Sequence, residues 1–560
     1  MRFVILLVWL LVMATNVAAQ KDPLYNFPLK INYRISGAYA ELRGNHYHAG
    51  LDMSTMGVEN VEVHAAEKGW VSRVKVSPYG YGRALYIDHP DGHTTVYGHL
   101  NGFASKIDEF VRKVQYATES FDVDTLLSAG QIVVERDEVV ALSGNTGGSG
   151  GPHLHFEVRD TQSEEPLNPL RFLPPIKDDV APVLYGIKVY ALGEKSQVDD
   201  CTTDKYFATN VARDRRINVF GEIGLGLHCT DYIGQNSRPC GVVCIELYDN
   251  EKLVFKSSVE HFSFETNRHV NSHIDYAERR RTKRFVQKSF VEPGNKLPIY
   301  SNVCTPIRIS DGEVHKMLYV AKDFAGNRAT LSFTLVGKKN LAIKDKSSLD
   351  GEFVDWQRTW VKDTLGIEIL MPHHSLFDNT CIAVEKIGEA IAVGNPDVPF
   401  AKAMSLTMNV PNKWLRRASQ VYIGCLNEKG VGAYLTSSVE ADTATCKGAM
   451  LVKGLATTFG RFAVCIDSIA PTIRIRNKAT TLKPNNLIMI GVADDVSGIS
   501  HYDVRIDGRW EVFEYDYKKA RLIATPAYLG LNSGRHHLVA TVTDACGNSR
   551  ILEWDFTLAK

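Results

Sequence analysis

Residues 143–158 read Ser-Gly-Asn-Thr-Gly-Gly-Ser-Gly-Gly-Pro-His-Leu-His-Phe-Glu-Val, a glycine-rich loop that runs into a short alternating segment. Because successive side chains of a β-strand point to opposite faces, His153 and His155 share one face while Leu154 and Phe156 share the other. The apolar pair then faces a core. The two imidazoles, about 7 Å apart, open onto one cleft, so that one can bind a metal while the other points toward the water on that metal. The stretch predicts a β-strand that carries part of a metal site.

The segments around this strand also alternate. Residues 71–76 and 84–88 have period two, and Pro90-Asp91-Gly92 supplies a hairpin turn before residues 94–97. This pattern predicts an antiparallel β architecture from about residue 25 to 175. Residues 103–116 differ, because their apolar side chains recur at helical spacing. One amphipathic helix is therefore expected to interrupt the sheet.

A second group of candidate ligands is His48-Ala49-Gly50-Leu51-Asp52. On an extended strand His48 and Asp52 would stand about 13 Å apart, whereas two ligands of one zinc ion must bring their donor atoms within about 4 Å. The chain must therefore curl between them. Gly50 favours this curl, since glycine adopts backbone angles that other residues resist. A third group is Tyr97-Gly98-His99-Leu100, in which a histidine ends a strand.

Two imidazoles and one carboxylate with an open fourth position are typical of catalytic zinc, because structural zinc is normally closed by four protein ligands. Water in the open position has its pKa lowered to about 7 by zinc, which gives a nucleophile at neutral pH. Two further histidines beside the ion would accept a proton and stabilise charge on the attacked carbonyl. Each group alone is a weak signal, and their joint occurrence carries the prediction. His46, two residues from His48, is a rival ligand.

At these residues the sequence resembles the lysostaphin/LytM-type zinc endopeptidases (metallopeptidase family 23), which cut peptidoglycan peptides. The resemblance covers about residues 44–173 and includes, in the family's order, His48 to Asp52, Gly69 to Val71, Tyr97 to Leu100, Ser143 to Val158 and Asn168-Pro169. It implies an antiparallel β-sheet catalytic domain with His48, Asp52 and His155 as zinc ligands. It also implies His153 as the general base and His99 as the residue that stabilises the oxyanion.

Some relatives in that family have lost ligands and activate amidases by protein contact, whereas all five residues are present here. This favours an enzyme over a regulator. The chain departs from the family in a longer stretch at about residues 101–130, which contains the predicted helix. That stretch either forms one wall of the cleft or is a surface excursion away from it. The glycine-rich loop lacks the Lys-Ser/Thr of a P-loop, and we expect it to be a flexible approach to His153.

Beyond residue 176 the sequence contains an internal echo. Asp179-Val180-Ala181-Pro182 is followed by Asp323-Phe-Ala-Gly-Asn327, and Asp467-Ser-Ile-Ala-Pro471 is followed by Asp544-Ala-Cys-Gly-Asn548. Each Asp-x-x-Gly-Asn turn joins two alternating segments, which predicts β-sandwich modules resembling the immunoglobulin-like domains of bacterial surface proteins. The expected organisation is a signal peptide at 1–19, a LytM-type zinc peptidase domain at 20–176, an immunoglobulin-like module at 177–338, a β-rich module of uncertain fold at 339–466 and a second immunoglobulin-like module at 467–560.

The amino-acid composition argues against a disordered protein and against a nucleic-acid-binding protein. The 560 residues include 64 Lys and Arg against 64 Asp and Glu, and 44% are hydrophobic, which excludes intrinsic disorder. The balanced charge gives no reason to expect a nucleic-acid partner. All ten cysteines lie at or after Cys201, and both disulfides, for example through Cys240 or Cys244, and buried free thiols remain open.

Residues 1–19 are typical of a secretory signal peptide, with Arg2, an apolar run over residues 3–12 and a small-residue cleavage site at residues 17–19. No later window approaches the roughly 20 apolar residues of a spanning helix. We therefore expect an exported protein, periplasmic or associated with the cell envelope, with no membrane span in the mature chain.

The function hypothesis is a secreted zinc endopeptidase that hydrolyses peptide bonds in peptidoglycan stems or cross-links. Its expected partners are the peptidoglycan peptide and an envelope protein or the wall itself, met by the modules that follow residue 176. Two alternatives remain open at this point: a catalytically silent regulator of another wall hydrolase, and an envelope adhesion or scaffold protein.

Overall fold

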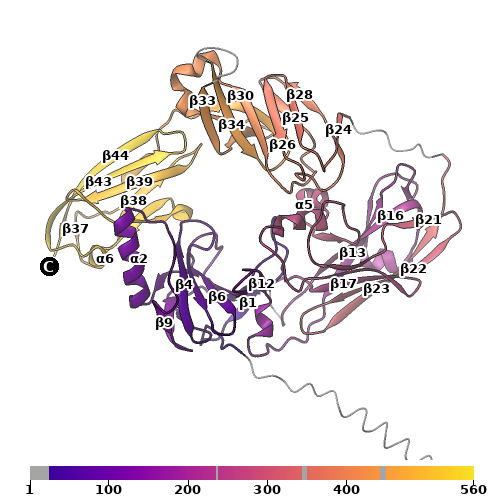
Figure 1. Ribbon diagram of the computed structural model, residues 1–560, viewed down its shortest axis with the longest axis horizontal. Helices are drawn as coiled ribbons and strands as arrows, with labels where there is room; N and C mark the ends of the chain where they lie inside the picture. The colour runs from indigo at the N-terminus through magenta and orange to yellow at the C-terminus, as the bar shows by residue number, and fades with distance from the viewer. Residues whose placement is uncertain (1–23, 235–237, 343–349, 442–448) are drawn as a thin grey trace, which may run out of the picture.

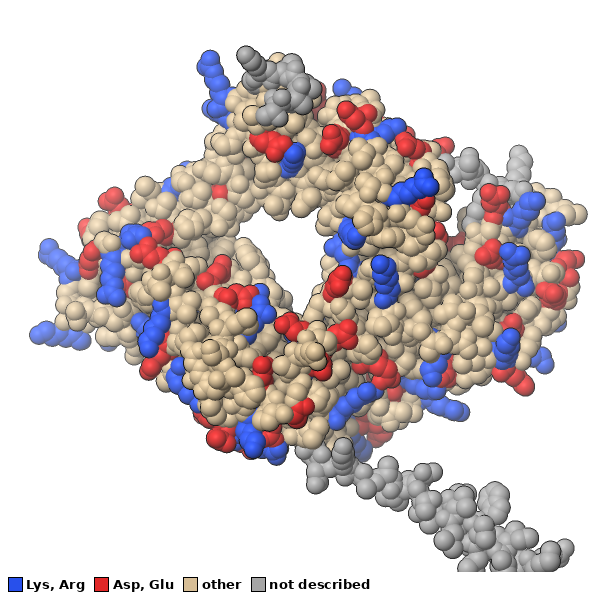
Figure 2. Space-filling model, in the orientation of Figure 1, with Lys and Arg blue, Asp and Glu red and all other residues tan. Residues whose placement is uncertain are grey.

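The computed structural model describes residues 24–234, 238–342, 350–441 and 449–560, and the chain over these ranges is mainly β. The predicted signal peptide at 1–19 lies outside them. Four β-rich parts follow one another around a ring, and the last part returns to the first (Figure 1). We call them the N-terminal domain (β1 to β12), the second module (β13 to β23), the third module (β24 to β35) and the C-terminal module (β36 to β44). Figure 2 shows an opening through the middle of this ring, with basic and acidic side chains interspersed over the visible face.

The N-terminal domain contains two antiparallel sheets. The larger has the order β1-β2-β11-β6-β5-β4-β8, with β12 paired to β11 and β9 to β4, and the smaller has the order β3-β10-β7. Their bounds are β1 (Arg34–Gly37), β2 (Leu51–Ser54), β3 (Glu62–His64), β4 (Gly69–Val76), β5 (Arg83–Asp88), β6 (His93–Leu100), β7 (Gly102–Phe103), β8 (Val123–Leu126), β9 (Val133–Val134), β10 (Val139–Leu142), β11 (His153–Asp160), β12 (Pro166–Leu167) and the 3-10 helix η1 (Pro169–Arg171).

The alternation read from the sequence is confirmed in this sheet. Leu154 and Phe156 of β11 are fully buried, and they pack in the same core as Val71 and Val74 of β4 and Leu85 of β5. The predicted helix is also present, as α2 (Ser105–Thr118), two residues later than expected at each end. Ile107 and Val111 are its buried apolar residues.

The second module is built on an eleven-stranded sheet of order β15-β13-β16-β23-β22-β17-β18-β20, with β14, β19 and β21 paired to β16. All its pairings are antiparallel except that of β16 with β23. Its elements are β13 (Val183–Ala191), β14 (Gln197–Val198), β15 (Lys205–Ala208), α3 (Thr209–Asp214), β16 (Arg216–Thr230), β17 (Cys244–Asp249), β18 (Lys252–Ser258), η2 (Asn267–His269), α4 (Val270–His273), α5 (Tyr276–Thr282), β19 (Val286–Lys288), β20 (Tyr300–Val303), β21 (Ile307–Ile309), β22 (Val314–Lys322) and β23 (Arg328–Gly337).

The third module, whose fold the sequence leaves uncertain, has two five-stranded sheets that share one apolar core. Their orders are β25-β26-β30-β34-β33 and β28-β29-β35-β31-β32, and β24 pairs with β27 beside them. The bounds are β24 (Glu352–Val354), β25 (Trp360–Thr364), β26 (Ile367–Met371), β27 (Thr380–Ile382), β28 (Val384–Ile387), β29 (Ala390–Val393), β30 (Met404–Asn409), η3 (Asn412–Gln420), β31 (Val421–Leu426), β32 (Gly432–Tyr434), β33 (Ser437–Ala441), β34 (Met450–Ala456) and β35 (Gly460–Ile466).

The C-terminal module also has two sheets, of order β36-β38-β42-β41 and β37-β44-β43-β39-β40. Their elements are β36 (Thr472–Ile475), β37 (Thr481–Leu482), β38 (Ile488–Ala493), β39 (Ile499–Ile506), β40 (Arg509–Trp510), β41 (Glu514–Asp516), η4 (Tyr517–Lys519), β42 (Arg521–Ala524), α6 (Pro526–Leu529), β43 (Gly534–Asp544) and β44 (Ser549–Leu558). All nine cysteines within the described ranges are free thiols. The helices in these ranges are too short or too polar to span a membrane.

The echo in the sequence corresponds to one repeated hydrogen-bond arrangement. In the second module the Asn327 side-chain amide donates to Asp323 Oδ2 at 2.9 Å and to the carbonyl oxygen of Asp178 at 3.1 Å. In the C-terminal module the Asn548 amide donates to Asp544 Oδ2 at 2.7 Å and to the carbonyl oxygen of Asp467 at 2.9 Å. In each module, the Asn of the Asp-x-x-Gly-Asn turn is thus hydrogen-bonded to the residue at which the module begins.

The ring is closed by contacts between the C-terminal module and α2 of the N-terminal domain. Apolar side chains of both parts form one continuous core. Around it, the Arg83 guanidinium lies 2.7 Å from Glu514 Oε2, and the Tyr116 hydroxyl donates to Glu511 Oε2 at 2.6 Å. The Arg112 guanidinium packs over the Tyr528 ring, 4.4 Å from its centroid. The two ends of the chain are therefore packed as one unit.

Candidate metal centre

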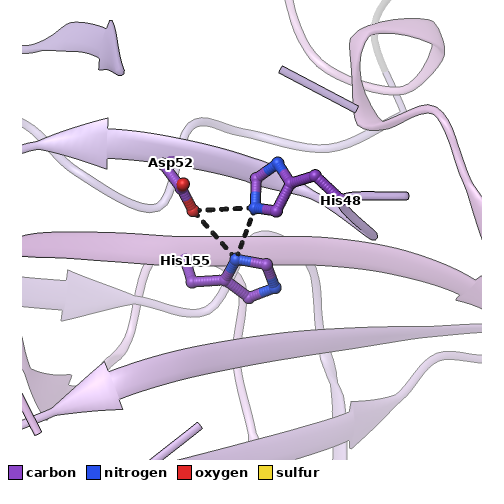
Figure 3. Close-up of side chains that lie close together, drawn as sticks. All are labelled: His48, Asp52 and His155. Atoms are coloured by element: carbon purple, nitrogen blue, oxygen red, sulfur yellow. Dashed lines mark hydrogen bonds and ion pairs between the residues drawn. The ribbon is translucent and has the colours of Figure 1, made fainter. Parts of the chain in front are cut away.

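Strand pairing brings the candidate ligands together. β2 pairs with β11 so that Asp52 lies directly opposite His155, and His48 lies three residues before β2. Asp52 Oδ1 is 3.0 Å from His48 Nε2 and 2.9 Å from His155 Nδ1, and the two nitrogens are 3.0 Å apart (Figure 3). Three donor atoms of the types that zinc prefers thus form a nearly equilateral triangle.

The chain curls between His48 and Asp52 as expected, but the role of Gly50 differs from the prediction. Gly50 does not adopt a left-handed backbone conformation; a Cβ atom there would lie 2.3 Å from the carbonyl oxygen of Phe156. The residue is glycine because the loop passes directly against β11, where a side chain has no space.

Hydrogen bonds on the far side of each ring decide which nitrogens are free. His48 Nδ1 donates to the carbonyl oxygen of Ala38 at 2.8 Å, and His155 Nε2 donates to Glu157 Oε1 at 2.7 Å. In the neutral rings, His48 Nε2 and His155 Nδ1 therefore both carry lone pairs, and these face each other and Asp52. Lone pairs at this separation repel unless a proton or a metal ion lies between them. Burial alone would lower the pKa of His155, but its hydrogen bonds to Asp52 and Glu157 raise that pKa to about 9, so without a metal the ring binds a proton at this position. Two imidazole nitrogens and a carboxylate oxygen arranged in this way also fit a bound metal ion.

Glu157 supports the candidate site from behind His155, and the sequence did not single it out. It is fully buried, and it contacts His155, Arg159 and the Tyr81 hydroxyl. Burial by itself would raise the pKa of the Glu157 carboxyl, but the charge of Arg159 and the hydrogen bond from His155 outweigh this and hold the pKa well below its usual range. The available signal was the period-two run itself, since residues 153, 155, 157 and 159 of β11 share one face.

We expect Glu157→Gln to weaken zinc binding by about 10–100-fold, the usual effect of removing a charged partner behind a metal-ligating histidine. Glutamine keeps the size of the side chain but not the charge that makes His155 more basic. The measurement is a zinc competition titration with a chromophoric chelator, with Glu135→Gln on the exposed surface of the same domain as the control. An unchanged zinc affinity would contradict this role.

The second oxygen of Asp52 has its own partner, because the Arg43 guanidinium lies 3.0 Å from Oδ2. Burial alone would raise the pKa of Asp52, but His48, His153 and His155 together hold that pKa well below its usual range. Gly37 makes this arrangement possible, since a Cβ atom there would lie 2.4 Å from Asp52 Oδ2. The carboxylate is thus kept ionised, as a metal ligand must be.

His153 and His99 both border the triangle. His153 Nδ1 donates to the carbonyl oxygen of Gly151 at 2.8 Å, while its Nε2 lies 3.4 Å from Asp52 Oδ1. His99 Nδ1 donates to the carbonyl oxygen of Thr146 at 2.8 Å, and its ring centroid is 4.8 Å from that of His153. In both neutral rings Nε2 is therefore the proton-accepting nitrogen. All five residues selected from the sequence lie around one cleft.

His99 is held in an unfavourable backbone conformation, with φ of 60° at a residue that is not glycine. Burial, followed by the neighbouring imidazoles His155 and His153, lowers the pKa of His99 to about 3. The ring is therefore neutral at physiological pH. Strained residues of this kind concentrate at functional sites, where the surrounding structure holds them in place. His46 is not part of the triangle; its Nδ1 bonds Asn45 Oδ1 at 2.9 Å.

The five residues line a cleft of about 650 Å³ that the second module helps to form. Phe264, Asn267 and Arg268 of that module lie on its wall. Asn267 Oδ1 accepts from the backbone amide of Tyr47 at 2.6 Å, next to His48. No motif in the sequence indicated this wall. Two roles were left open for residues 101–130, a wall of the cleft or an excursion away from it. None of these described residues lines this cleft, and Tyr116 contacts the C-terminal module instead.

The glycine-rich loop is packed, where a flexible approach was expected. Gly147 has a φ of 65°, and a Cβ atom on it would lie 2.3 Å from the backbone nitrogen of Gly82. Lys518 of the C-terminal module donates to the carbonyl oxygens of Asn145 and Ser149, the latter at 3.0 Å. The Ser149 hydroxyl in turn lies 3.1 Å from His153 Nδ1. The module most distant in sequence therefore holds the loop that positions His153.

The five candidate residues lie within a stretch of the chain that matches a known protein family. Residues 46–169 match the model of peptidase family M23. An uncharacterized metalloprotease of Haemophilus influenzae is 31% identical over 137 residues, which cover 23% of this chain and 24% of that protein. The DD-carboxypeptidase/endopeptidase Mpg of Neisseria meningitidis is 31% identical over 123 residues, 22% of each chain. The chain thus spans about a quarter of the length of these curated relatives.

Solved structures give similar matches. A zinc-containing peptidase from Vibrio cholerae is 28% identical, with a TM-score of 0.20, and covers 27% of this chain and 41% of its own. The catalytic domain of lysostaphin from Staphylococcus simulans is 26% identical, with a TM-score of 0.18, and covers 25% of this chain and 92% of its own.

Proposed function

We propose that this chain, whose residues 46–169 are a peptidase family M23 domain, is a zinc endopeptidase that hydrolyses peptide bonds in peptidoglycan stems or cross-links. The observation that carries the proposal is the triangle of His48 Nε2, Asp52 Oδ1 and His155 Nδ1, with lone pairs directed inward by the partners behind each ring. The peptidoglycan substrate is supported by the name of the Neisseria relative, a DD-carboxypeptidase/endopeptidase.

His48, Asp52 and His155 would hold the zinc ion, which supplies a Lewis acid for the scissile carbonyl and a water of lowered pKa. His153 would accept a proton of the attacking water at Nε2, since its Nδ1 is held by Gly151, and would pass that proton to the nitrogen of the leaving amine. His99 can donate to a developing oxyanion only when Nε2 carries a proton, because its Nδ1–H is already given to Thr146. In both His153 and His99, Nε2 is thus a proton acceptor at the start of the reaction. The ring that takes up a proton can then donate it to the oxyanion or to the leaving group.

The rest of the chain would position this domain at the wall. We propose export by the signal peptide at 1–19 and a location in the periplasm or the cell envelope, with immunoglobulin-like modules at 177–338 and 467–560 and the third module between them. These modules would contact the wall or an envelope protein. Phe264, Asn267 and Arg268 of the second module line one side of the cleft, which supports a role for this module in selecting the peptide.

Digestion of purified sacculi tests the function. We expect the zinc-loaded chain to release new amino groups, to lose this activity on treatment with a chelator and to regain it on addition of zinc, and mass analysis of the muropeptides identifies the bond. A protein with stoichiometric zinc that releases no amino groups but stimulates an amidase would be a regulator. Wall binding by the full chain, without any hydrolysis, would indicate an adhesion or scaffold protein.

Replacing Lys518 with alanine should lower kcat about tenfold while bound zinc remains stoichiometric. The substitution frees the carbonyl oxygens of Asn145 and Ser149, and small displacements of a catalytic group of about 1 Å reduce rates by up to about 10². The measurement is kcat on a soluble cross-linked peptide together with zinc content. Lys519→Ala is the matched control, since Lys519 pairs only loosely with Asp516, at 3.8 Å. Equal kcat values for the two variants would contradict this role of Lys518.

A further inference from the structure

Three carboxylates converge at the edge of the second module that faces the N-terminal domain. Asp178 lies in the connection before β13, Asp231 directly follows β16 and Asp323 directly follows β22. Each offers an oxygen that lies within 4.8 Å of the others. The cluster is separate from the zinc site and shares no residue with it.

Two members of this cluster are nearly inaccessible to solvent, with Asp231 3% and Asp323 5% exposed. Within the described ranges none of the three forms an ion pair, and the nearby Lys177 pairs with Asp179 instead, at 3.5 Å. Asp231 Oδ1 is buried and has no hydrogen-bond partner. A buried carboxylate oxygen without a partner is strongly unfavourable, so this atom indicates a missing ligand.

The C-terminal module contains the equivalent cluster, Asp467, Asp494 and Asp544, and supplies a comparison within the same chain. There the Ser497 hydroxyl donates to Asp467 Oδ2 at 2.6 Å. The backbone amide of Gly498 donates to Asp494 Oδ2 at 2.8 Å. No oxygen of that cluster is buried without a partner among the described residues. The two modules share the turn that contributes to the cluster, and of the two clusters, over the described residues, the one in the second module has a buried oxygen without a partner.

We propose that Asp178, Asp231 and Asp323 bind a calcium ion. The donor set contains only oxygen atoms, which selects hard cations and disfavours zinc. Calcium accepts six to eight oxygen ligands in a flexible geometry, whereas magnesium requires nearly ideal octahedral geometry and usually keeps several waters, so a site built from three protein carboxylates fits calcium better. Without a cation, burial followed by the charges of Asp323 and Asp178 raises the pKa of Asp231 to about 7, which is the response expected of crowded carboxylates.

The ion would lie at the junction of two parts of the ring. A cavity of about 280 Å³ is lined both by Asp178 and Asp231 and by Ala38, Tyr39 and Asn168 of the N-terminal domain. Ala38 is the residue whose carbonyl oxygen holds His48. Calcium would therefore stabilise the contact between the second module and Ala38, the residue that hydrogen-bonds the proposed zinc ligand His48.

Calcium titration of the full chain tests the proposal. The protein is first freed of divalent ions, reloaded with one equivalent of zinc and then titrated with calcium up to about 1 mM, the weak end of extracellular calcium sites. We expect the wild type to bind calcium at this site and to melt at a higher temperature in its presence. Asp231→Asn and Asp323→Asn should each lose one calcium equivalent and the calcium-dependent rise in Tm, whereas Asp179→Asn keeps both.

Asp231→Asn also reports on folding, because removing a repelled charge should leave its Tm in calcium-free buffer no lower than that of the wild type. The proposal is overturned if the wild type binds no calcium, if both the Asp231 and Asp323 variants keep the full stoichiometry, or if the equivalent is lost in Asp494→Asn instead. Tighter binding of magnesium than of calcium would overturn the assignment of the ion.

Discussion

His155→Ala should abolish zinc binding and hydrolysis together. The substitution removes one of three donors and leaves a two-residue remnant, because His48 and Asp52 cannot complete a zinc site alone. Metal-assisted polarisation contributes several kcal/mol to catalysis, so we expect kcat/KM to fall by at least about 10³-fold. The measurements are zinc content by mass spectrometry and release of amino groups from sacculi.

His46→Ala is the control for this experiment, because His46 is the rival ligand in the sequence and lies outside the triangle. It should retain one zinc per chain. Full zinc content in His155→Ala, or loss of zinc in His46→Ala, would show that the triangle is not the metal site. Circular dichroism of both variants separates loss of metal from loss of fold.

His153→Gln should separate catalysis from metal binding. Glutamine is polar and of similar size, but it cannot take a proton, so a general base at this position would be lost while the three donors remain. We expect kcat to fall by about 10²–10⁴-fold, the usual contribution of general acid–base catalysis, with zinc still stoichiometric and KM little changed. The measurement is steady-state kinetics on a cross-linked peptide, with zinc content measured on the same sample.

The control carries the same substitution at an exposed position, His501→Gln on the C-terminal module. Two outcomes would contradict the role of His153. Loss of zinc from His153→Gln would place His153 in the metal site, and unchanged kcat would leave His99, the other proton acceptor in the cleft, as the base. Comparison with His99→Gln then distinguishes the two rings.

These two predictions depend on partners that hold the rings from behind. The carbonyl oxygens of Ala38, Gly151 and Thr146 each accept from a histidine Nδ1, which leaves the opposite nitrogen free. These three partners are backbone atoms, which any residue at those positions supplies, whereas the partner of His155 is the side chain of Glu157. No sequence motif records them, although they decide what each imidazole can do.

Features that depend on neighbouring residues, such as strand alternation, helical spacing and turns, can be predicted from the sequence. Period-two alternation requires only that one face of a strand be buried, and so the face of β11 that bears His153 and His155 followed from residues 153–158 alone. A helix at 103–116 was predicted from its apolar spacing in the same way, and the observed helix, Ser105–Thr118, begins and ends two residues later. The repeated Asp-x-x-Gly-Asn turns were also visible, because the turn residues hydrogen-bond one another over four positions.

Contacts between distant segments could not be read in this way. Gly50 is required by the closeness of Phe156, more than one hundred positions away, and not by its own backbone angles. Glu157 lies on the predicted face, yet its partnership with His155 and Arg159 depends on complete burial, which the spacing does not reveal.

The amino-acid order thus determined the strand pattern and the choice of His48, Asp52, His99, His153 and His155, because each depends on side-chain type at short separation. Only the tertiary structure decided that the ring closes, that Lys518 reaches the glycine-rich loop and that Asn267 supports the segment of His48. The physical reason is that hydrogen bonds and apolar packing act over a few ångströms in space, whatever the distance along the chain.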